Sequence, residues 1–517
     1  MKNQGIYYFN SHNEHETYIN SKDYKEPYVC YDREHIHYHN YALSYLTFIA
    51  EEDGTFKLSG NDVNYSLDNG VTWTTLVSNT NSPTVQAGDK IMFKATLTPT
   101  TSGIGTFSST GKFIACGNVM SLLYGDDFKG KTDLSGKSFN NLFNNCRRLT
   151  NTKNLSLPAT TLSGNCYANM FYGCTSLTTA PQLPATTLAQ SCYYQMFRGC
   201  TSLTKAPALP ATTLEYACYL YMFYGCKSLT IAPVLPAITL TTECYYGMFY
   251  GCTSLTTAPQ LPATTLAQSC YEYMFYDCTS LTTAPQLSAT TLANYCYRNM
   301  FRGCTSLTTT PLLPATTLSE SCYAYMFIGC TSLTTALQLP ATTLAPSCYE
   351  YMFDGCTSLT IAPELPATTL ADYCYSNMFS GCTSLTTAPE LPVTTLVYGC
   401  YQSMFYGCSS LIKAPSILPA TTLKDYCYAL MFQDCTSLTT APVLPATILT
   451  PQCYRYMFYG CTSLNNITCL ATNRSALACT YYWVNGVASS GTFTKAASTN
   501  WSTGVSGRPS GWTVQNA

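Results

Sequence analysis

The strongest constraint in this sequence is a self-similar unit that recurs every 26 residues. The period is broken once, by an interval of 27 where Ile417 is inserted. The second cysteine of each unit marks it: Cys174, Cys200, Cys226, Cys252, Cys278, Cys304, Cys330, Cys356, Cys382, Cys408, Cys435 and Cys461. A unit this short cannot bury a hydrophobic core alone, so copies of it must stack on one another. The sequence therefore predicts a solenoid of about 12 units.

In the first half of a unit, apolar side chains recur every four residues. The unit that begins at Leu188 runs L-A-Q-S-C-Y-Y-Q-M-F-R-G-C-T-S-L-T-K-A-P-A-L-P-A-T-T. Cys192, Met196 and Cys200 continue the spacing, which is typical of one stripe of a short helix. Gly199 suits a left-handed helix cap. We therefore expect a short helix in each unit.

The second half of the unit is rich in threonine and predicts an extended segment. This stretch runs from Leu203 to Leu209 and ends at Pro210, and we expect its leucines to point inward. In a stack, each side chain lies on its equivalent in the next unit. We expect structural ladders at Cys192, Cys200, Cys218, Cys226, Met196 and Leu203.

The placement of cysteine follows the repeat. Of the 29 cysteines, 24 form twelve pairs with the spacing C-x7-C, from Cys166 and Cys174 to Cys453 and Cys461. The favoured interpretation is that both members are small buried residues, since free cysteine is among the most buried residue types. Disulfides are the alternative, and they require a side-chain geometry that a sequence does not reveal. Zinc is a weaker alternative because the spacing differs from that of short metal-binding loops.

The regions outside the array divide the chain further. We expect a polar N-terminal attachment arm in 1–42, a small β-sandwich in 43–130, an N-terminal cap with a degenerate repeat in 131–165, the solenoid in 166–465 and a C-terminal cap in 466–517. Alternating apolar patterns, with turns at Asp53-Gly54 and Asn69-Gly70, favour the β-sandwich. Caps are expected because an open array exposes its core and unpaired strand edges.

Two short patterns lie in the N-terminal regions. Ser66 to Trp73 reads S-L-D-N-G-V-T-W, a hairpin pattern called an Asp box, and we interpret this single copy as structural. His35, His37 and His39 alternate, so on a strand they would share one face. Three such strands in a trimer could surround a metal ion. The favoured interpretation of the histidine stretch is an exposed polar arm, with no metal.

Charge and composition argue against several functions. Charged residues make up only 10% of the chain and the formal net charge is −2, so we expect no nucleic acid partner. No run of eighteen apolar residues occurs and the first residues are polar, so we expect no membrane insertion and no signal peptide in this chain. The repeats contain no histidine and their acidic residues are scattered singly, so we expect neither enzyme activity nor a cofactor.

Tyrosine is the clearest sign of a binding surface. The chain holds 43 tyrosines, many in the pattern C-Y-x-Y-M-F. An exposed ring offers flat apolar area with a polar tip, which suits stacking on sugar rings or contact with proteins. The positions around the first cysteine also vary between units, by drift or by selection for recognition. The candidate binding residues are Tyr194, Tyr216, Tyr221, Tyr246, Tyr273, Tyr295, Tyr325, Tyr351, Tyr373 and Tyr456.

The motif M-F-x-G-C-T-S-L-T-x-A-P-x-L-P, repeated from Met170 to Leu464, closely resembles BspA-like leucine-rich repeat surface proteins of gut Bacteroidales and their phages. This resemblance implies an α/β solenoid, a right-handed leucine-rich-repeat-like array of about 12 strand-helix units of 26 residues, preceded here by the small β-sandwich domain. It also implies adhesion or surface binding, with no catalytic residues to carry over.

The N-terminal stretch Glu26-Pro27-Tyr28-Val29, with Ile36-His37-Tyr38, is similar to a leader in proteins of phages of those bacteria. We therefore expect a phage fibre or decoration component on the virion surface, or an extracellular cell-surface protein, that binds a cell-surface glycan or protein. Residues 1–42 are then expected to contact other virion proteins, and a homotrimer is the assembly that fibres suggest. The alternatives are a rigid structural spacer and a secreted bacterial adhesin for a host protein.

Overall fold

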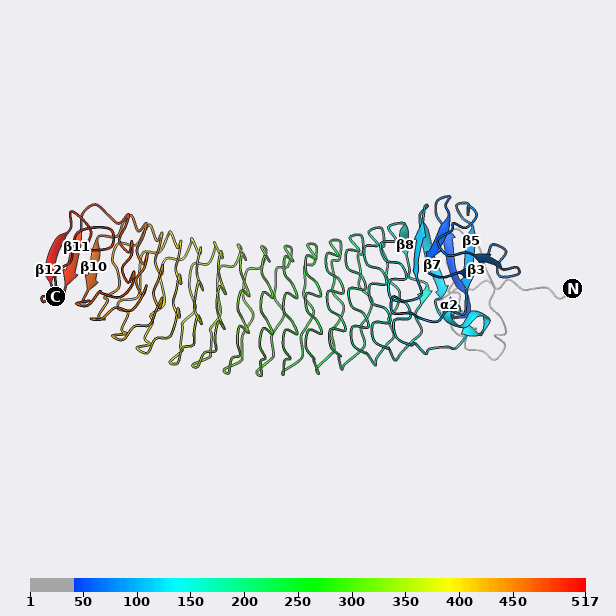
Figure 1. Ribbon diagram of the computed structural model, residues 1–517, viewed down its shortest axis with the longest axis horizontal. Coiled ribbons are helices and arrows are strands. Elements are labelled where there is room, and N and C mark those ends of the chain that lie inside the picture. Colours follow the sequence, from blue (N-terminus) through cyan, green and yellow to red (C-terminus); the bar gives the residue numbers. More distant parts are fainter. Residues whose placement is uncertain (1–40) are drawn as a thin grey trace, which may run out of the picture.

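The computed structural model describes residues 41–517, which form an elongated stack of coils with strand-rich regions at both ends (Figure 1). The N-terminal region contains η1 (Tyr41–Leu43), β1 (Leu46–Ala50), β2 (Phe56–Ser59), β3 (Val63–Ser66), β4 (Thr74–Leu76), β5 (Lys90–Lys94), β6 (Thr106–Ser109), β7 (Phe113–Asn118), α2 (Ser121–Tyr124) and η2 (Gly125–Phe128). The first coil carries β8 (Leu149–Asn151) and β9 (Leu155–Ser156), and the C-terminal end carries β10 (Asn466–Cys469), β11 (Thr492–Lys495) and β12 (Thr513–Asn516). Residues 1–40 of the expected arm, with His35, His37 and His39, lie outside the described residues.

Two sheets near the N-terminus share one core. The larger sheet has the strand order β4-β3-β5-β1-β7-β8, with β9 also paired to β7, and the smaller sheet pairs β2 with β6. Phe48 in β1 connects them, because its ring centroid lies 5.3 Å from that of Phe56 in β2 and 4.9 Å from that of Phe107 in β6. Alternate side chains of β2, such as Leu58, are buried in this core, as expected for a strand with one covered face.

The larger sheet continues directly into the array. β7 is antiparallel to β1 on one side, and on its other side it pairs in parallel with β8 and β9 of the first coil. Phe113 of β7 lies opposite Leu149 of β8. The second coil joins through a parallel bridge between Asn151 and Thr179. The sheet therefore covers the first coil and pairs with its strand edge, which would otherwise be open.

The Asp-box hairpin joins β3 to β4 and is held by its own side chains. A carboxylate oxygen of Asp68 accepts a hydrogen bond from the Thr72 amide at 2.9 Å, and Nε1 of Trp73 donates to the Gly70 carbonyl at 3.1 Å. The Ser66 hydroxyl donates to Asp68 at 2.7 Å and is the largest cause that lowers the pKa of Asp68 to about 2. These contacts are local and stabilise the turn itself.

The first half of each coil is a series of turns, and the prediction of a short helix there is wrong. No part of 189–200 is helical. Within the coil, hydrogen bonds close over three residues, as when the Met196 amide donates to the Tyr193 carbonyl at 3.1 Å. The amides between these donate to the next coil, as Phe197 does to the carbonyl of Met222 at 2.9 Å. We call residues 189–200 and their equivalents in the other coils the turn segment.

A left-handed residue at every fourth position explains the turns. Ser191, Gln195 and Gly199 have φ angles of 53°, 52° and 74°. Residues with these φ angles interrupt an α-helix. In addition, every second amide donates to the next coil, whereas in an α-helix these amides would bond within the segment. The four-residue spacing of buried side chains therefore comes from turns that repeat every four residues. Gly199 is left-handed as expected, but it belongs to this series and does not cap a helix.

The second half of each coil is extended and makes single bridges to its neighbours. Lys205 pairs in parallel with Ile231, and Thr213 with Thr239. The prolines between these bridges have no amide hydrogen to donate, so a continuous ladder does not form. Leu203 points inward and has an exposed fraction of 0%.

The interior of the array consists of columns of like side chains. Tyr193 stacks on Tyr219 in the next coil with 5.7 Å between ring centroids and an interplanar angle of 3°. Phe197 and Phe223 continue a second column beside it at 5.6 Å. Large apolar area is thus buried in a repeating arrangement. The expected ladder residues Cys192, Cys200, Cys218, Cys226 and Met196 lie in this interior, each with an exposed fraction of 0%.

Aromatic residues close the C-terminal end. β10, β11 and β12 form a parallel sheet that succeeds the last coil. Trp483 stands where other coils carry methionine, and its ring centroid lies 6.2 Å from that of Tyr454 and 5.4 Å from that of Trp501. Its Nε1 donates to the Gly507 carbonyl at 2.7 Å. The wider indole fills the core where the repeat pattern ends.

Candidate functional site

The turn segments stack into a surface on which tyrosine is frequent. In each segment both cysteines, the tyrosine after the first cysteine, the methionine and the phenylalanine are buried. Most residues between them are half-buried or exposed. The chemistry that this surface offers is therefore set by the intervening residues, which differ from coil to coil.

Three tyrosines form a stacked row across three consecutive coils. Tyr224 stacks on Tyr250 with 4.6 Å between ring centroids and an interplanar angle of 18°. Tyr250 stacks on Tyr276 at 4.3 Å and 9°. All three are half-buried, so each ring keeps part of its surface accessible to solvent. Because the rings cover one another's faces, the row offers a narrow strip of ring edges and phenol groups, an aromatic platform that runs along the array.

A second row of tyrosines lies beside the first. Tyr221 meets Tyr246 edge to face at 5.3 Å, and Tyr246 meets Tyr273 at 5.3 Å in a tilted arrangement. The two rows touch where Tyr221 approaches Tyr224 at 5.5 Å and where Tyr273 approaches Tyr276 at 5.9 Å. We call these six residues the tyrosine cluster: Tyr221, Tyr224, Tyr246, Tyr250, Tyr273 and Tyr276.

Two tyrosines of the cluster occupy strained backbone positions. Tyr221 and Tyr273 have φ angles of 54° and 58°. A left-handed conformation costs a bulky residue about 1–2 kcal/mol, a cost that glycine avoids. Gly247 holds the equivalent position in the coil between them, and a methyl group there would collide with the ring of Tyr221. Residues at the equivalent position of other coils, such as Asn299 and Leu430, are left-handed too, so this strain follows from the turns of the array.

Arginines lie at the two ends of the stacked row. Cζ of Arg198 is 4.3 Å from the centroid of the Tyr224 ring, and Cζ of Arg302 is 5.5 Å from that of Tyr276. Both distances allow an attraction between the cation and the ring face. The cluster is therefore a strip of rings with a cation at each end.

Burial controls the ionisation of groups in and around the cluster. Glu272 has an exposed fraction of 6%, and its Oε1 lies 3.7 Å from Nε of Arg298. Burial raises the pKa of Glu272. Burial is also the main cause that raises the pKa of Tyr246 and of Tyr250. Both phenols therefore stay protonated at neutral pH and can donate hydrogen bonds.

The structure brings some of the predicted binding tyrosines together. Tyr221, Tyr246 and Tyr273 belong to the cluster. Tyr325 and Tyr351 form a separate stacked pair at 5.1 Å. The other predicted tyrosines have contacts of their own: Tyr373 with Tyr398, Tyr456 with Tyr459, Tyr216 with Glu243, Tyr295 with Glu320 and Tyr194 with Gln195.

The sequence reasoning missed the stacked row itself. Tyr224, Tyr250 and Tyr276 each stand two residues before the second cysteine of a unit, in Y-G-C or Y-D-C. The repetition of tyrosine at this position in three successive units was a usable signal. We did not use this signal because we expected a helix, and the residues that share a face of a helix differ from those that share a face in a series of turns.

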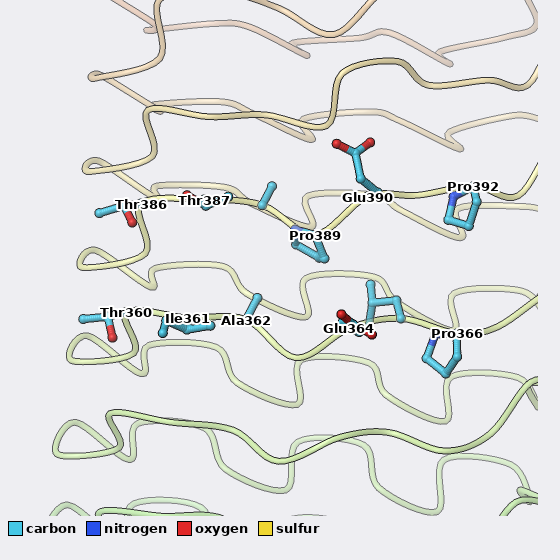
Figure 2. A pocket seen from close by; sticks show the side chains of 12 residues that line it. Thr360, Ile361, Ala362, Glu364, Pro366, Thr386, Thr387, Pro389, Glu390 and Pro392 are labelled. Atoms are coloured by element: carbon cyan, nitrogen blue, oxygen red, sulfur yellow. The ribbon is translucent and has the colours of Figure 1, made fainter.

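A second surface feature is a groove between the extended halves of neighbouring coils. Figure 2 shows Glu364 on one coil and Glu390 on the next among the residues that line it. The groove has a volume of about 430 Å³, and a similar one of about 370 Å³ lies beside Lys205 and Ile231. Proline prevents hydrogen bonding between the coils at these places, which leaves the space open. Neither groove contains an aromatic platform.

The described cysteines are unreactive by environment. Every cysteine within 41–517 is free and buried. Burial raises the pKa of the Cys192 thiol to about 12, so the nucleophilic thiolate is scarce at neutral pH. The same residues contain no group of three or more His, Cys, Asp or Glu side chains placed to hold a metal ion. In this part of the chain, chemistry at the surface comes from tyrosines and charged groups.

Together, stacked 26-residue coils, buried ladders of like side chains and a tyrosine-rich outer surface define a leucine-rich repeat protein. The chain belongs to the family of the BspA type leucine rich repeat region, whose model matches in six copies at residues 139–232, 219–360 and 297–439, more than half of the sequence. The resemblance of the repeat motif is thereby confirmed. No curated protein and no solved structure is significantly similar to the chain.

Proteins of this family are generally non-enzymatic and typically lie at the cell surface or outside the cell. The family thus indicates a surface or adhesion-type repeat protein. Within residues 41–517, no helix is both long and apolar enough to cross a membrane.

Proposed function

We propose that the protein is a non-enzymatic adhesin that binds glycans through the outer surface of its turn segments, with the tyrosine cluster as the main site. The observation that carries this proposal is the stacked row of Tyr224, Tyr250 and Tyr276, whose ring centroids are 4.6 Å and 4.3 Å apart. Rings held in this way offer apolar area that is ordered before a ligand arrives, so little side-chain entropy is lost on binding.

The direction of the row supports an extended ligand. Tyr224, Tyr250 and Tyr276 come from successive coils, so the platform lengthens along the array. The apolar face of a pyranose ring can pack on the exposed edges of these rings, while protonated phenols donate hydrogen bonds to sugar hydroxyls. A linear polysaccharide lying along the array would contact several rings at once. Because these contacts are linked in one ligand, they act together and the affinity exceeds that of any single contact.

A binding role without catalysis agrees with the groups around the cluster. Glu272, a buried carboxylate beside the tyrosines, lies 3.7 Å from Nε of Arg298, and the charge of Glu243 is the smallest of the influences on its pKa. General acid and base catalysis on a glycan needs two such groups across the scissile bond. The thiols are buried and protonated, so they do not supply a nucleophile.

We further propose a location on a phage virion, with a bacterial or mucosal glycan as the target and residues 1–42 as the attachment to other virion proteins. A homotrimer would agree with that placement. Finding the gene beside capsid or tail genes, and the protein in purified particles, tests this part. A signal peptide in the genomic reading frame would instead indicate a secreted bacterial adhesin for a host protein.

Glycan binding is tested with the full chain on bacterial and mucin glycans. The triple variant Tyr224→Ala, Tyr250→Ala and Tyr276→Ala should lose about tenfold or more in affinity, because the stacked platform is removed. Tyr406→Ala is the matched control, since Tyr406 stands at the equivalent position of a later coil and is 37% exposed. A triple variant that binds like the wild type would contradict the proposal.

A rigid spacer is the second candidate, and two deletions of equal length separate it from the adhesin. Deleting 201–304 removes four coils including the tyrosine cluster, whereas deleting 305–408 removes four coils outside it. Both deletions rejoin the repeat in register. A spacer should give the same binding with either deletion, and an adhesin should lose binding only with the first.

A further inference from the structure

Arg198, the cation at the start of the tyrosine cluster, contacts aromatic rings but makes no ion pair within residues 41–517. Arg198 lies on the coil before the cluster, and its Cζ is 4.3 Å from the Tyr224 centroid, 5.5 Å from that of Tyr221 and 5.8 Å from that of Tyr172. Three rings therefore surround one guanidinium. Contacts of this kind are made by the face of the group and leave the N–H donors at its edge available.

Arg198 has no acidic partner within residues 41–517. No ion pair and no side-chain hydrogen bond of this guanidinium occurs there. Two cations that also lie over aromatic rings are paired: Arg298 lies 3.7 Å from Glu272, and Lys94 lies 2.8 Å from Asp126. An arginine held in place by rings but lacking a carboxylate is preorganised to bind one in a bidentate manner.

The opposite end of the cluster is electrostatically different. Arg302 lies over Tyr276, but Asp277 is close enough for Arg302 to lower the pKa of its carboxyl group, against the larger effect of burial. NH1 of Arg302 is also 3.5 Å from Oδ1 of Asn299. Arg302 therefore acts on the nearby carboxylates of Asp277 and Asp354, whereas among residues 41–517 Arg198 has no ion pair.

From this asymmetry we infer that the ligand of the tyrosine cluster is an acidic glycan, in which a uronic acid unit lies along the exposed edges of Tyr224 and Tyr250 and places its carboxylate against the edge of Arg198. A carboxylate attached to the pyranose ring lies at the rim of the sugar, so it can reach the guanidinium while the apolar face of the sugar stays on the tyrosine edges. This inference rests on the proposed function, and it specifies the chemistry of the ligand at that same site.

The probes are oligogalacturonate and its methyl ester, which differ only in the charge of the carboxyl groups. The wild-type chain should bind the acid at least about tenfold more tightly than the ester, as expected for a charge-assisted bidentate contact. Raising the salt concentration should weaken binding of the acid. Dextran sulfate and dextran form a further pair that tests whether a sulfate group can replace the carboxylate.

Arg198→Gln should reduce the affinity for oligogalacturonate to that for the ester and leave the ester unaffected. Lys205→Gln is the matched control, because it removes the same charge from an exposed residue of the extended half of the same coil. Arg198→Lys should recover only part of the preference, since lysine lacks the planar pair of donors.

Several outcomes would overturn the inference: equal binding of acid and ester by the wild type, unchanged acid binding by Arg198→Gln, an equal loss with Lys205→Gln, binding of dextran sulfate in place of oligogalacturonate, or no binding of either anionic probe. The triple tyrosine variant keeps the two proposals apart. If it binds like the wild type, the proposed site is wrong. If it loses binding while Arg198→Gln has no effect, only the acidic ligand is wrong.

Discussion

The thiol of Cys200 donates a hydrogen bond to the carbonyl oxygen of Phe171 in the preceding coil, at 3.0 Å. The same oxygen also accepts the amide of Cys174 at 3.2 Å. The relationship recurs along the array, so the second cysteine of each pair is both a small core residue and a donor that links neighbouring coils. Alanine would lack the donor.

Replacing Cys200 by alanine should lower the free energy of unfolding by about 1–3 kcal/mol, because the link to Phe171 and the packing of the sulfur are both lost. Chemical unfolding followed by circular dichroism measures the change. Thr212→Ala, at an exposed position of the same coil, is the control and should be close to neutral. Equal stability of the two variants would mean that the thiol contributes no more than a surface methyl group.

Leu203→Asp should be far more disruptive. Leu203 is fully buried, so the variant places a carboxylate in the core without a partner. We expect a loss of more than about 3 kcal/mol, or failure of the nearby coils to fold. Thr204→Asp introduces the same charge at an exposed neighbour and should have little effect. Thermal unfolding of Leu203→Asp at the wild-type temperature would show that the leucine does not pack in the core.

Leu430→Gly should stabilise the array. Leu430 has a φ of 57°, a conformation that costs a branched side chain about 1–2 kcal/mol, and only part of this gain is offset by the greater chain entropy of glycine. We expect the free energy of unfolding to rise by about 0.5–1 kcal/mol in urea titrations. Ala429→Gly, at the preceding buried position, should instead lower it. A loss of stability in Leu430→Gly would indicate that its side-chain contacts outweigh the strain.

Stability should decline at alkaline pH. Burial raises the pKa of the Cys192 thiol from 9.0 to about 12 and keeps the pKa of Tyr193 well above 10.0. In the unfolded chain these groups ionise near their ordinary values, so the folded state binds more protons above pH 9. The stabilisation is complete below pH 9 and is lost as the pH rises toward 12.

Urea unfolding between about pH 7 and pH 11 checks this expectation. Phenolate absorbance measured in parallel should show that the buried tyrosines ionise together with unfolding. An unfolding free energy that does not change up to pH 11 would contradict it.

The stack was predictable from the sequence because a strict period forces each coil onto its neighbour. The inward position of Leu203 follows from the same pattern. The local backbone was not predictable, because a four-residue spacing of apolar side chains fits both a helix and a series of turns. Gly, Asn, Ser and Asp recur at left-handed positions such as Gly199 and Asn377, and this signal favours turns. Tyrosine also occupies some of these positions, as at Tyr221, and this weakens the turn signal because tyrosine is not a typical left-handed residue.

Only part of the candidate site could be predicted from the sequence, because the contacts between coils depend on the assembled structure. Tyr221, Tyr246 and Tyr273 stand out in the repeated C-Y-x-Y-M-F pattern or next to it. The stacking of Tyr250 on Tyr276 depends on how far successive coils are displaced and on side-chain rotamers, which the spacing of residues does not specify. The isolation of Arg198 from acids is likewise a property of the assembled surface.

The pairing of β7 with β8 has a consequence for how the molecule assembles. A single coil has no paired strand of its own to build on, whereas β7 is already paired with β1 on one edge and offers its other edge to the first coil. Each added coil then presents the same edge to the one that follows. We therefore expect folding to start at the N-terminal sheet and to proceed outward, in the order in which a ribosome releases the coils.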